Sequence, residues 1–180
     1  MKKILVLAIA VLAVTTMHAQ KVYSTKSAKV RFFSSTAAED IEATNSQAES
    51  KLASANGQMM FMLLVKGFRF ENELMQNHFN DKDYMNSDQY PKSEFKGTIT
   101  NISTVNFAKD GTYPVTTEGN LTIRGITQKV TASGTLTVAA GKVSVKSVFK
   151  IKVKDFGFTG KLITGTISDQ VEITVTAKYD

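Results

Sequence analysis

A two-residue alternation of apolar and polar side chains runs from about residue 94 to residue 178 and constrains this chain more than any other feature. Leu121 and Ile123, for example, alternate with Asn120, Thr122 and Arg124. Successive side chains of a β-strand point to opposite faces of a sheet, so the pattern predicts strands with one buried and one solvated face. Gly, Asn and Asp bound the runs, and these residues favour turns. The sequence therefore predicts an all-β fold.

The expected strands occupy most of the chain after residue 21. They fall at residues 22–35, 41–44, 58–66, 94–100, 115–124, 130–138, 143–154 and 171–178. Residues 45–56 are polar and rich in Ala and Ser, which leaves helix and loop open as alternatives there. About eight strands, joined in order by short turns, predict an antiparallel meander that closes into a barrel and so removes its edges.

Residues 58–66 depart from the alternation because they are apolar at consecutive positions. Both faces of this strand are therefore expected to be covered, one by the barrel interior and the other by a helix that follows Asn72. Because both alternating sets of side chains are apolar, the pattern leaves open which set points inward.

The stretch from Asn72 to Pro91 predicts a short helix and a tight loop packed on the barrel. Asn72 can cap the helix, and Glu73 places negative charge on its first turn. The pairs four residues apart that give the helix an apolar side are Leu74 with His78 and Met75 with Phe79. The helix is expected to end near Asn80, and Asp88 to cap or turn the segment before Pro91. This segment is interpreted either as a plug over hydrophobic strands or as a lid over a cavity.

The first 19 residues have the three parts of a secretory signal peptide. Lys2 and Lys3 precede an apolar run at residues 4–14, and Ala19 offers a small residue for cleavage. The run is too short to span a bilayer as a stable helix. Cleavage after Ala19 would leave residues 20–180 as one domain, and we expect that domain in the periplasm. The chain has no cysteine, so neither a lipoprotein attachment site nor a disulfide framework is expected.

The formal net charge of +6 includes two lysines of the signal peptide, so the exported chain carries about +4. The lysines are spread over alternate strand positions, and the chain has no tryptophan and no run that interleaves aromatic and basic residues. A solvated surface explains this pattern better than a nucleic-acid interface, so no nucleic-acid partner is expected.

Three stretches carry a recognisable pattern. They are Asn77-His78-Phe79, the run Tyr84, Ser87-Asp88, Tyr90-Pro91 and Phe95-Lys96, and the continuous segment from Gly119 to Thr127. Together they resemble the YceI-like family of exported lipid-binding proteins. The resemblance implies a lipocalin-like extended antiparallel β-barrel with a helical segment against it, which encloses a polyisoprenoid or fatty-acyl chain. The chain departs from the family pattern in lacking a charged pair before His78 and in having front strands that read as shorter.

The candidate lipid-binding residues lie on one expected face of the strands. They are Met60, Met62, Leu64, Phe95, Ile99, Leu121, Ile123, Val145, Phe149, Ile151, Ile173 and Val175. Periodicity alone leaves open whether this face packs on itself or lines a cavity. The resemblance implies the cavity. A polar headgroup would stay at the rim, where Lys66, Arg69 or Arg124 could meet an acid or phosphate.

The sequence offers little for catalysis or metal binding. His78 is the only histidine after the signal peptide, and neither a cysteine nor a Gly-x-Ser-x-Gly turn supplies a nucleophile. Asp81, Asp83 and Asp88 lack the glycine and the closing Glu of a calcium loop. We therefore expect no catalytic residue, cofactor or metal, and we expect His78 to fix the helix by a hydrogen bond to a strand-end carbonyl.

These observations favour a non-catalytic periplasmic protein that encloses an isoprenoid or fatty-acyl chain for sequestration or transport. A self-packed structural or interaction barrel without a ligand is the alternative. An outer-membrane barrel is a weaker one, because the strands lack aromatic girdles and the helix has no place in a lipid-facing wall. An enzyme acting on a buried lipid would have to use His78 as its base. A homodimer of two barrels is compatible with each of these functions.

Overall fold

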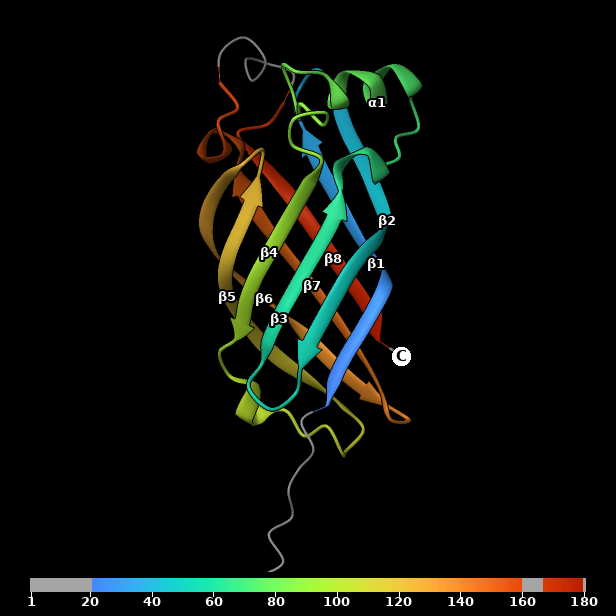
Figure 1. Ribbon diagram of the computed structural model, residues 1–180, viewed down its shortest axis with the longest axis vertical. Coiled ribbons are helices and arrows are strands. Elements are labelled where there is room, and N and C mark those ends of the chain that lie inside the picture. The colour runs from blue at the N-terminus through green and yellow to red at the C-terminus, as the bar shows by residue number, and fades with distance from the viewer. Residues whose placement is uncertain (1–20, 160–166, 180) are drawn as a thin grey trace, which may run out of the picture.

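The computed structural model describes residues 21–159 and 167–179, and these form a closed antiparallel barrel of eight strands. The strands pair in the order of the sequence, and β1 also pairs with β8 (Figure 1). Their bounds are β1 Val22–Ser35, β2 Asp40–Ala53, β3 Gln58–Leu64, β4 Lys92–Ile99, β5 Gly111–Ile123, β6 Ile126–Ala139, β7 Lys142–Lys152 and β8 Gln170–Tyr179. The prediction of an all-β, lipocalin-like barrel is confirmed.

Tight turns join the long strands at the positions that the sequence predicts. Arg124 and Gly125, between β5 and β6, have φ angles of 50° and 75°. Ala140 and Gly141, between β6 and β7, have φ angles of 49° and 75°. Two successive residues with positive φ match the right-handed twist of the flanking strands, and glycine adopts such angles without steric cost.

The first strand has the predicted bounds, whereas the second, with 14 residues, is longer than the predicted residues 41–44. The polar stretch at residues 45–53 belongs to β2, where Asn45 is buried. Its amide donates to the carbonyl of Leu64 at 2.9 Å and accepts from the backbone N–H of Gln47 at 2.9 Å. Register shifts between Thr25 and Val30 interrupt the alternation. The expectation of a short second strand was wrong because satisfied polar groups and register shifts mask the period of two.

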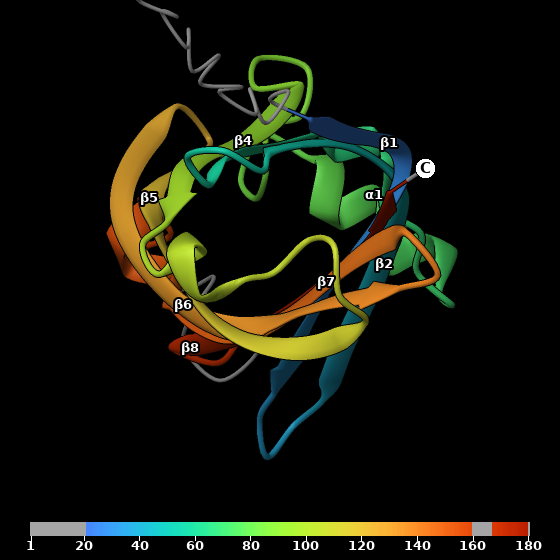
Figure 2. The same ribbon diagram turned by 90° about the horizontal axis from the view of Figure 1, so that it is seen from below.

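The lower end of the barrel in Figure 1 is the end opposite the helix labelled α1. Buried side chains of the barrel itself fill this end. We call the buried residues Tyr23, Leu52, Leu136 and Tyr179 the lower plug. Figure 2 shows the connection between β4 and β5, which carries the 3-10 helix η2 (Ile102–Thr104), passing across this end. Phe107 of that connection stacks on Tyr23 with ring centroids 5.6 Å apart.

A buried hydrogen bond crosses the lower plug. The hydroxyls of Tyr179 and Ser50 lie 2.8 Å apart, and both residues are about 1% exposed. Burial raises the pKa of the Tyr179 phenol to about 12, although the hydrogen bond to Ser50 acts in the opposite direction. The phenol is therefore held neutral, which suits an apolar interior.

The upper end carries the helical segment. Helix α1 spans Glu73–Asn80, and the Asn72 side chain accepts hydrogen bonds from the backbone N–H groups of Leu74 and Met75 at 2.8 and 3.3 Å. Both the cap and the end at Asn80 confirm the prediction. Short 3-10 helices η1 (Val65–Gly67) and η3 (Val153–Phe156) also lie at this end. Within the described residues, no helix is both long and apolar enough to cross a membrane.

Candidate functional site

A cavity of about 310 Å³ lies inside the barrel between α1 and the lower plug. Every strand contributes to its wall, from Val30 of β1 and Ile41 of β2 round to Ile173 of β8. Met75 and Phe79 of α1 cover its upper end. The helix therefore serves as a lid over a cavity, which was one of the two interpretations of the sequence. We call the upper opening the mouth.

Most of the predicted inner-face residues line this cavity. Those that do are Phe95, Ile99, Leu121, Ile123, Val145, Phe149, Ile151, Ile173 and Val175. They come from β4, β5, β7 and β8, where apolar and polar residues alternate without interruption. Whether these side chains bind a lipid stays a prediction.

The sequence left the inner face of β3 open, and its candidates there, Met60, Met62 and Leu64, belong to the set that does not point inward. Residues directly opposite each other on antiparallel strands share a face, and Met59 and Phe61 pair with Gly97 and Phe95 of β4. The set of Met59, Phe61 and Leu63 therefore points inward, and each of the three lines the cavity. Both alternating sets are apolar, so only the register with β4 distinguishes them.

The other set of β3 side chains faces outward. Met60 and Leu64 pair with Lys96 and Lys92 and do not line the cavity, whereas Met62 pairs with Glu94 and borders it. Leu64 is 56% exposed, so α1 does not cover this face as expected. The helix instead lies over the mouth (Figure 1). Met60, which is half-buried, and Leu64 are therefore removed from the candidate lipid site.

A pair of glycines makes room for the ring of Phe95. Gly97 and Gly119 are directly opposite each other on β4 and β5. A Cβ atom on Gly97 would lie 2.5 Å from Cζ of Phe95, and one on Gly119 would lie 2.7 Å from the same atom. The ring therefore lies flat over the glycine pair and against the wall. A Cβ atom would also lie 2.4 Å from the carbonyl oxygen of Glu118 in the first case and 2.5 Å from that of Lys96 in the second, so larger residues would have to shift both the ring and the paired strands.

Three hydroxyl groups in the cavity wall, those of Ser34, Thr117 and Ser147, have protein partners. Ser147 donates to the carbonyl of Ser133 at 2.7 Å, and Ser34 accepts from the backbone N–H of Ser168 at 2.9 Å. Thr117 lies within hydrogen-bonding distance of the sulfur of Met59, at 3.9 Å. Because these groups are satisfied by the protein, the interior presents a surface suited to hydrocarbon.

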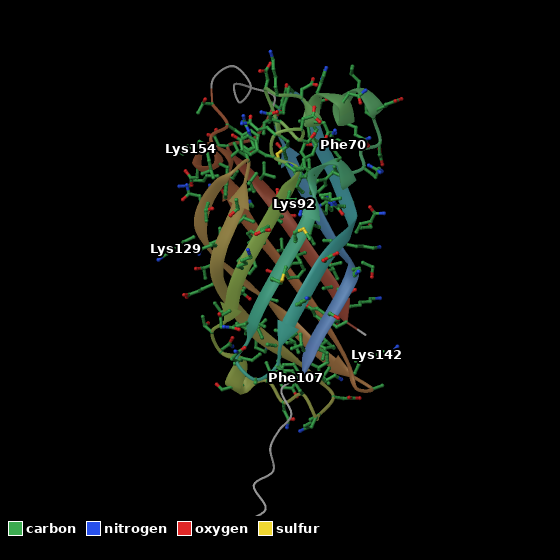
Figure 3. All side chains as sticks on the ribbon, viewed as in Figure 1. Phe70, Lys92, Phe107, Lys129, Lys142 and Lys154 are labelled. Carbon is green, nitrogen blue, oxygen red and sulfur yellow. The ribbon has the colours of Figure 1, made fainter. Side chains whose placement is uncertain are left out.

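Four phenylalanines anchor the lid at the mouth. Phe32 of β1, Phe68 and Phe70 of the segment before α1, and Phe79 of α1 have neighbouring ring centroids 5.1–5.7 Å apart. Figure 3 places Phe70 at the upper end and Phe107 at the lower end. Aromatic pairs at such distances add stability beyond the area that they bury. The alternation of Phe68 and Phe70 in the sequence was a signal for this cluster that the sequence interpretation missed.

Other predicted lid residues have different environments from those expected. Leu74 is 61% exposed and so does not pack on the barrel. His78 borders the cavity, but its ring stacks on Tyr84, with centroids 6.4 Å apart, and makes no hydrogen bond to the described residues. Asp88, by contrast, lies in the turn before Pro91 as expected, and its carboxylate accepts from Lys66 at 2.7 Å. Phe79, not His78, therefore fixes the helix.

The three rim cations differ in how they are engaged. Lys66 pairs with Asp88, and the Arg69 guanidinium donates to the carbonyls of Lys66 and Phe68. The guanidinium of Arg124 lies 5.1 Å from the ring centroid of Phe158, a residue that lines the cavity. Arg124 forms no ion pair with the residues described, which makes it the rim cation best placed to meet an anionic group at the mouth.

The described part of the chain contains no group of three or more His, Cys, Asp or Glu residues that could hold a metal ion. Asp81, Asp83 and His78 share the helical segment, but they do not converge on one point.

A closed eight-stranded barrel with an apolar interior and a helical lid defines the class of the protein, which is that of the lipocalin-like barrels with an internal cavity. Within that class, the model of the YceI-like domain matches residues 12–179. The chain therefore belongs to the YceI-like family.

Solved structures agree with this fold. The polyisoprenoid binding domain from Saccharophagus degradans has a TM-score of 0.74 at 12% identity, covering 89% of this chain and 98% of that one. BcnA from Burkholderia cenocepacia has a TM-score of 0.69 at 20% identity, covering 83% of this chain and 96% of that one. The YceI protein of Campylobacter jejuni has a TM-score of 0.57 at 20% identity, covering 74% and 80%. A search of curated proteins found no match.

Proposed function

We propose that this protein encloses the hydrocarbon chain of an isoprenoid or fatty-acyl lipid in its barrel, for sequestration or transport. The observation that carries the proposal is the cavity with its predominantly apolar wall, in which the hydroxyls of Ser34 and Ser147 are already bonded to the protein. Burial of ten methylene groups at about 0.8 kcal/mol each would contribute about 8 kcal/mol before the costs of association. That free energy corresponds to a dissociation constant in the micromolar range.

The structural comparisons support the same ligand class. The solved domain with a TM-score of 0.74 is described as polyisoprenoid binding. A shared fold by itself does not transfer a ligand between distant relatives. The proposal for this chain therefore depends on its own cavity residues.

In this proposal the protein is exported to the periplasm and catalyses no reaction. The predicted signal peptide, residues 1–19, lies outside the described residues and supports export through its sequence alone. His78 is exposed and stacks on Tyr84, a position from which it contacts no nucleophile among the described residues. Comparing cell fractions for the protein, together with N-terminal sequencing, tests both export and cleavage after Ala19.

Displacement of a fluorescent alkyl probe from the purified protein tests lipid binding. Ile173→Trp adds a large ring to the cavity wall, and Thr174→Trp adds the same ring one position along β8, on the outer face. We expect Ile173→Trp to weaken probe binding at least tenfold and Thr174→Trp to leave it unchanged. A wild-type barrel that is folded by circular dichroism yet binds neither probe nor lipid would instead support the self-packed alternative.

A polar headgroup is proposed to remain at the mouth beside Arg124. Arg124→Ala should weaken the binding of a fatty acid while sparing the alcohol of the same chain length, because only the acid carries a charge. Equal affinity losses for acid and alcohol would contradict a role in charge recognition. Lys129→Ala, on the outer wall of β6 in Figure 3, is the matched control.

A further inference from the structure

We propose that the floor of the cavity acts as a chain-length ruler, which admits one linear chain of about sixteen carbons and excludes longer ones. This inference rests on the proposed function and specifies its ligand. The floor is formed by Met59, Ile99, Val115 and Val145, which line the cavity and also belong to the hydrophobic cluster that contains the lower plug. Along each strand they are the lowest residues that reach the cavity.

Below the floor the barrel is filled by its own side chains. Leu52 and Leu136 are fully buried, yet neither lines the cavity. Two contacts hold this layer together. A hydrogen bond joins Tyr179 of β8 to Ser50 of β2, and Tyr23 of β1 stacks on Phe107 of the connection between β4 and β5. A longer ligand would have to break these contacts to pass the floor. The lower plug is therefore a fixed end to the cavity.

The strands provide a measure of the cavity depth. On β7 the lining runs from Val145 to Ile151 and continues to Val153 at the start of η3, and on β5 it runs from Val115 to Ile123. Each interval spans about eight residues, or about 26 Å along the strand at ~3.3 Å per residue. Because the strands tilt by about 40° from the barrel axis, this corresponds to a depth of roughly 20 Å along that axis. An extended chain advances about 1.2 Å per single bond, as the peptide backbone does. The depth therefore accommodates about sixteen carbons or four isoprene units.

The width accommodates a single chain. A volume of about 310 Å³ spread over roughly 20 Å of depth has a mean cross-section near 15 Å². Hydrocarbon chains in van der Waals contact are about 4 Å apart, so that section holds one chain. The preferred ligand class is then a single-chain lipid whose tail reaches the floor and whose polar end lies at the mouth.

A series of unbranched fatty acids from ten to twenty-two carbons, measured by probe displacement, tests the ruler in the wild-type protein. Affinity should rise about fourfold with each added methylene up to about sixteen carbons, since each one buries further apolar surface. Beyond that length it should fall, because a longer chain cannot reach the mouth with its polar end and the floor with its tail at once. A rise that continues to twenty-two carbons would overturn the ruler while upholding lipid binding, whereas no binding at any length would refute the proposed function itself.

Variants of the floor should shift the break in this series. Val145→Phe raises the floor by about 4 Å, so the break should move down by about three carbons. Val148→Phe makes the same change on the exposed outer face of β7 and should leave the break in place. Ile99→Ala shortens a floor side chain, so the break should move to chains about two carbons longer. Thermal unfolding without ligand verifies that each variant is folded, and an unmoved break in folded Val145→Phe would contradict the assignment of the floor.

Discussion

Alkaline pH should destabilise the lower plug through the buried phenol of Tyr179. Its pKa in the folded protein is about 12, against about 10 in an unfolded chain. Between these values the unfolded chain releases the phenolic proton while the folded protein retains it. A raised folded-state pKa therefore gives stability that is complete below pH 10 and is lost as the pH rises toward about 12. Two pKa units correspond to roughly 3 kcal/mol of unfolding free energy, lost at no more than about 1 kcal/mol per pH unit.

Urea unfolding at pH 8, 9, 10, 11 and 11.5, followed by circular dichroism, measures this loss. The matched reference is Tyr179→Phe combined with Ser50→Ala, because Phe alone would leave the Ser50 hydroxyl buried without a partner at a cost of about 1 kcal/mol. Lysines also lose charge in this range, but they do so equally in both proteins. The wild type should lose about 1 kcal/mol more between pH 10 and 11 than the reference does, because the phenol of the unfolded chain is already half deprotonated at pH 10. Parallel curves for the two proteins would refute a buried neutral phenol.

Three further substitutions test the cavity and its lid. Gly97→Ala places a Cβ atom 2.5 Å from Cζ of Phe95, so urea unfolding should show a stability loss of about 1–3 kcal/mol. The alkyl probe should also bind less tightly, and unchanged binding would contradict the role of the glycine pair in making room for the ring. Asn72→Ala removes the cap of α1 at about 1 kcal/mol, and hydrogen exchange of the amides of the first helical turn should quicken, whereas unchanged exchange would contradict capping. Phe61→Asp should abolish probe binding while Met60→Asp preserves it, and the reverse result would overturn the facing of β3.

The alternation of apolar and polar residues correctly predicted which side chains line the cavity on the strands whose outer face is marked by polar residues. On β7, Lys146 and Lys150 alternate with Val145, Phe149 and Ile151, so the inward set follows directly. The same holds for β5 and β8, where threonines and charged residues occupy the outer positions. Neighbouring side chains point to opposite faces of a strand, so when one set is charged the hydrophobic set must point inward.

The sequence could not predict features that depend on partners distant in the chain. The facing of β3 follows from its register with β4, and the strand structure around Asn45 depends on the carbonyl of Leu64, 19 residues away. Leu74 looked like part of an apolar helix face, but the phenylalanine cluster sets the orientation of α1 and leaves Leu74 exposed. The depth of the cavity depends on the lower plug, which joins residues as distant as Ser50 and Tyr179.

Native mass spectrometry of the protein purified from the cells that make it tests lipid enclosure most directly. We predict a mass excess of one single-chain lipid per barrel, which denaturing extraction should release and identify as an acyl or prenyl compound. The same spectra count the barrels in each particle, so a doubled mass would identify the homodimer that the sequence allows. A folded protein that is isolated empty and takes up no added single-chain lipid would contradict the proposal that the barrel encloses one.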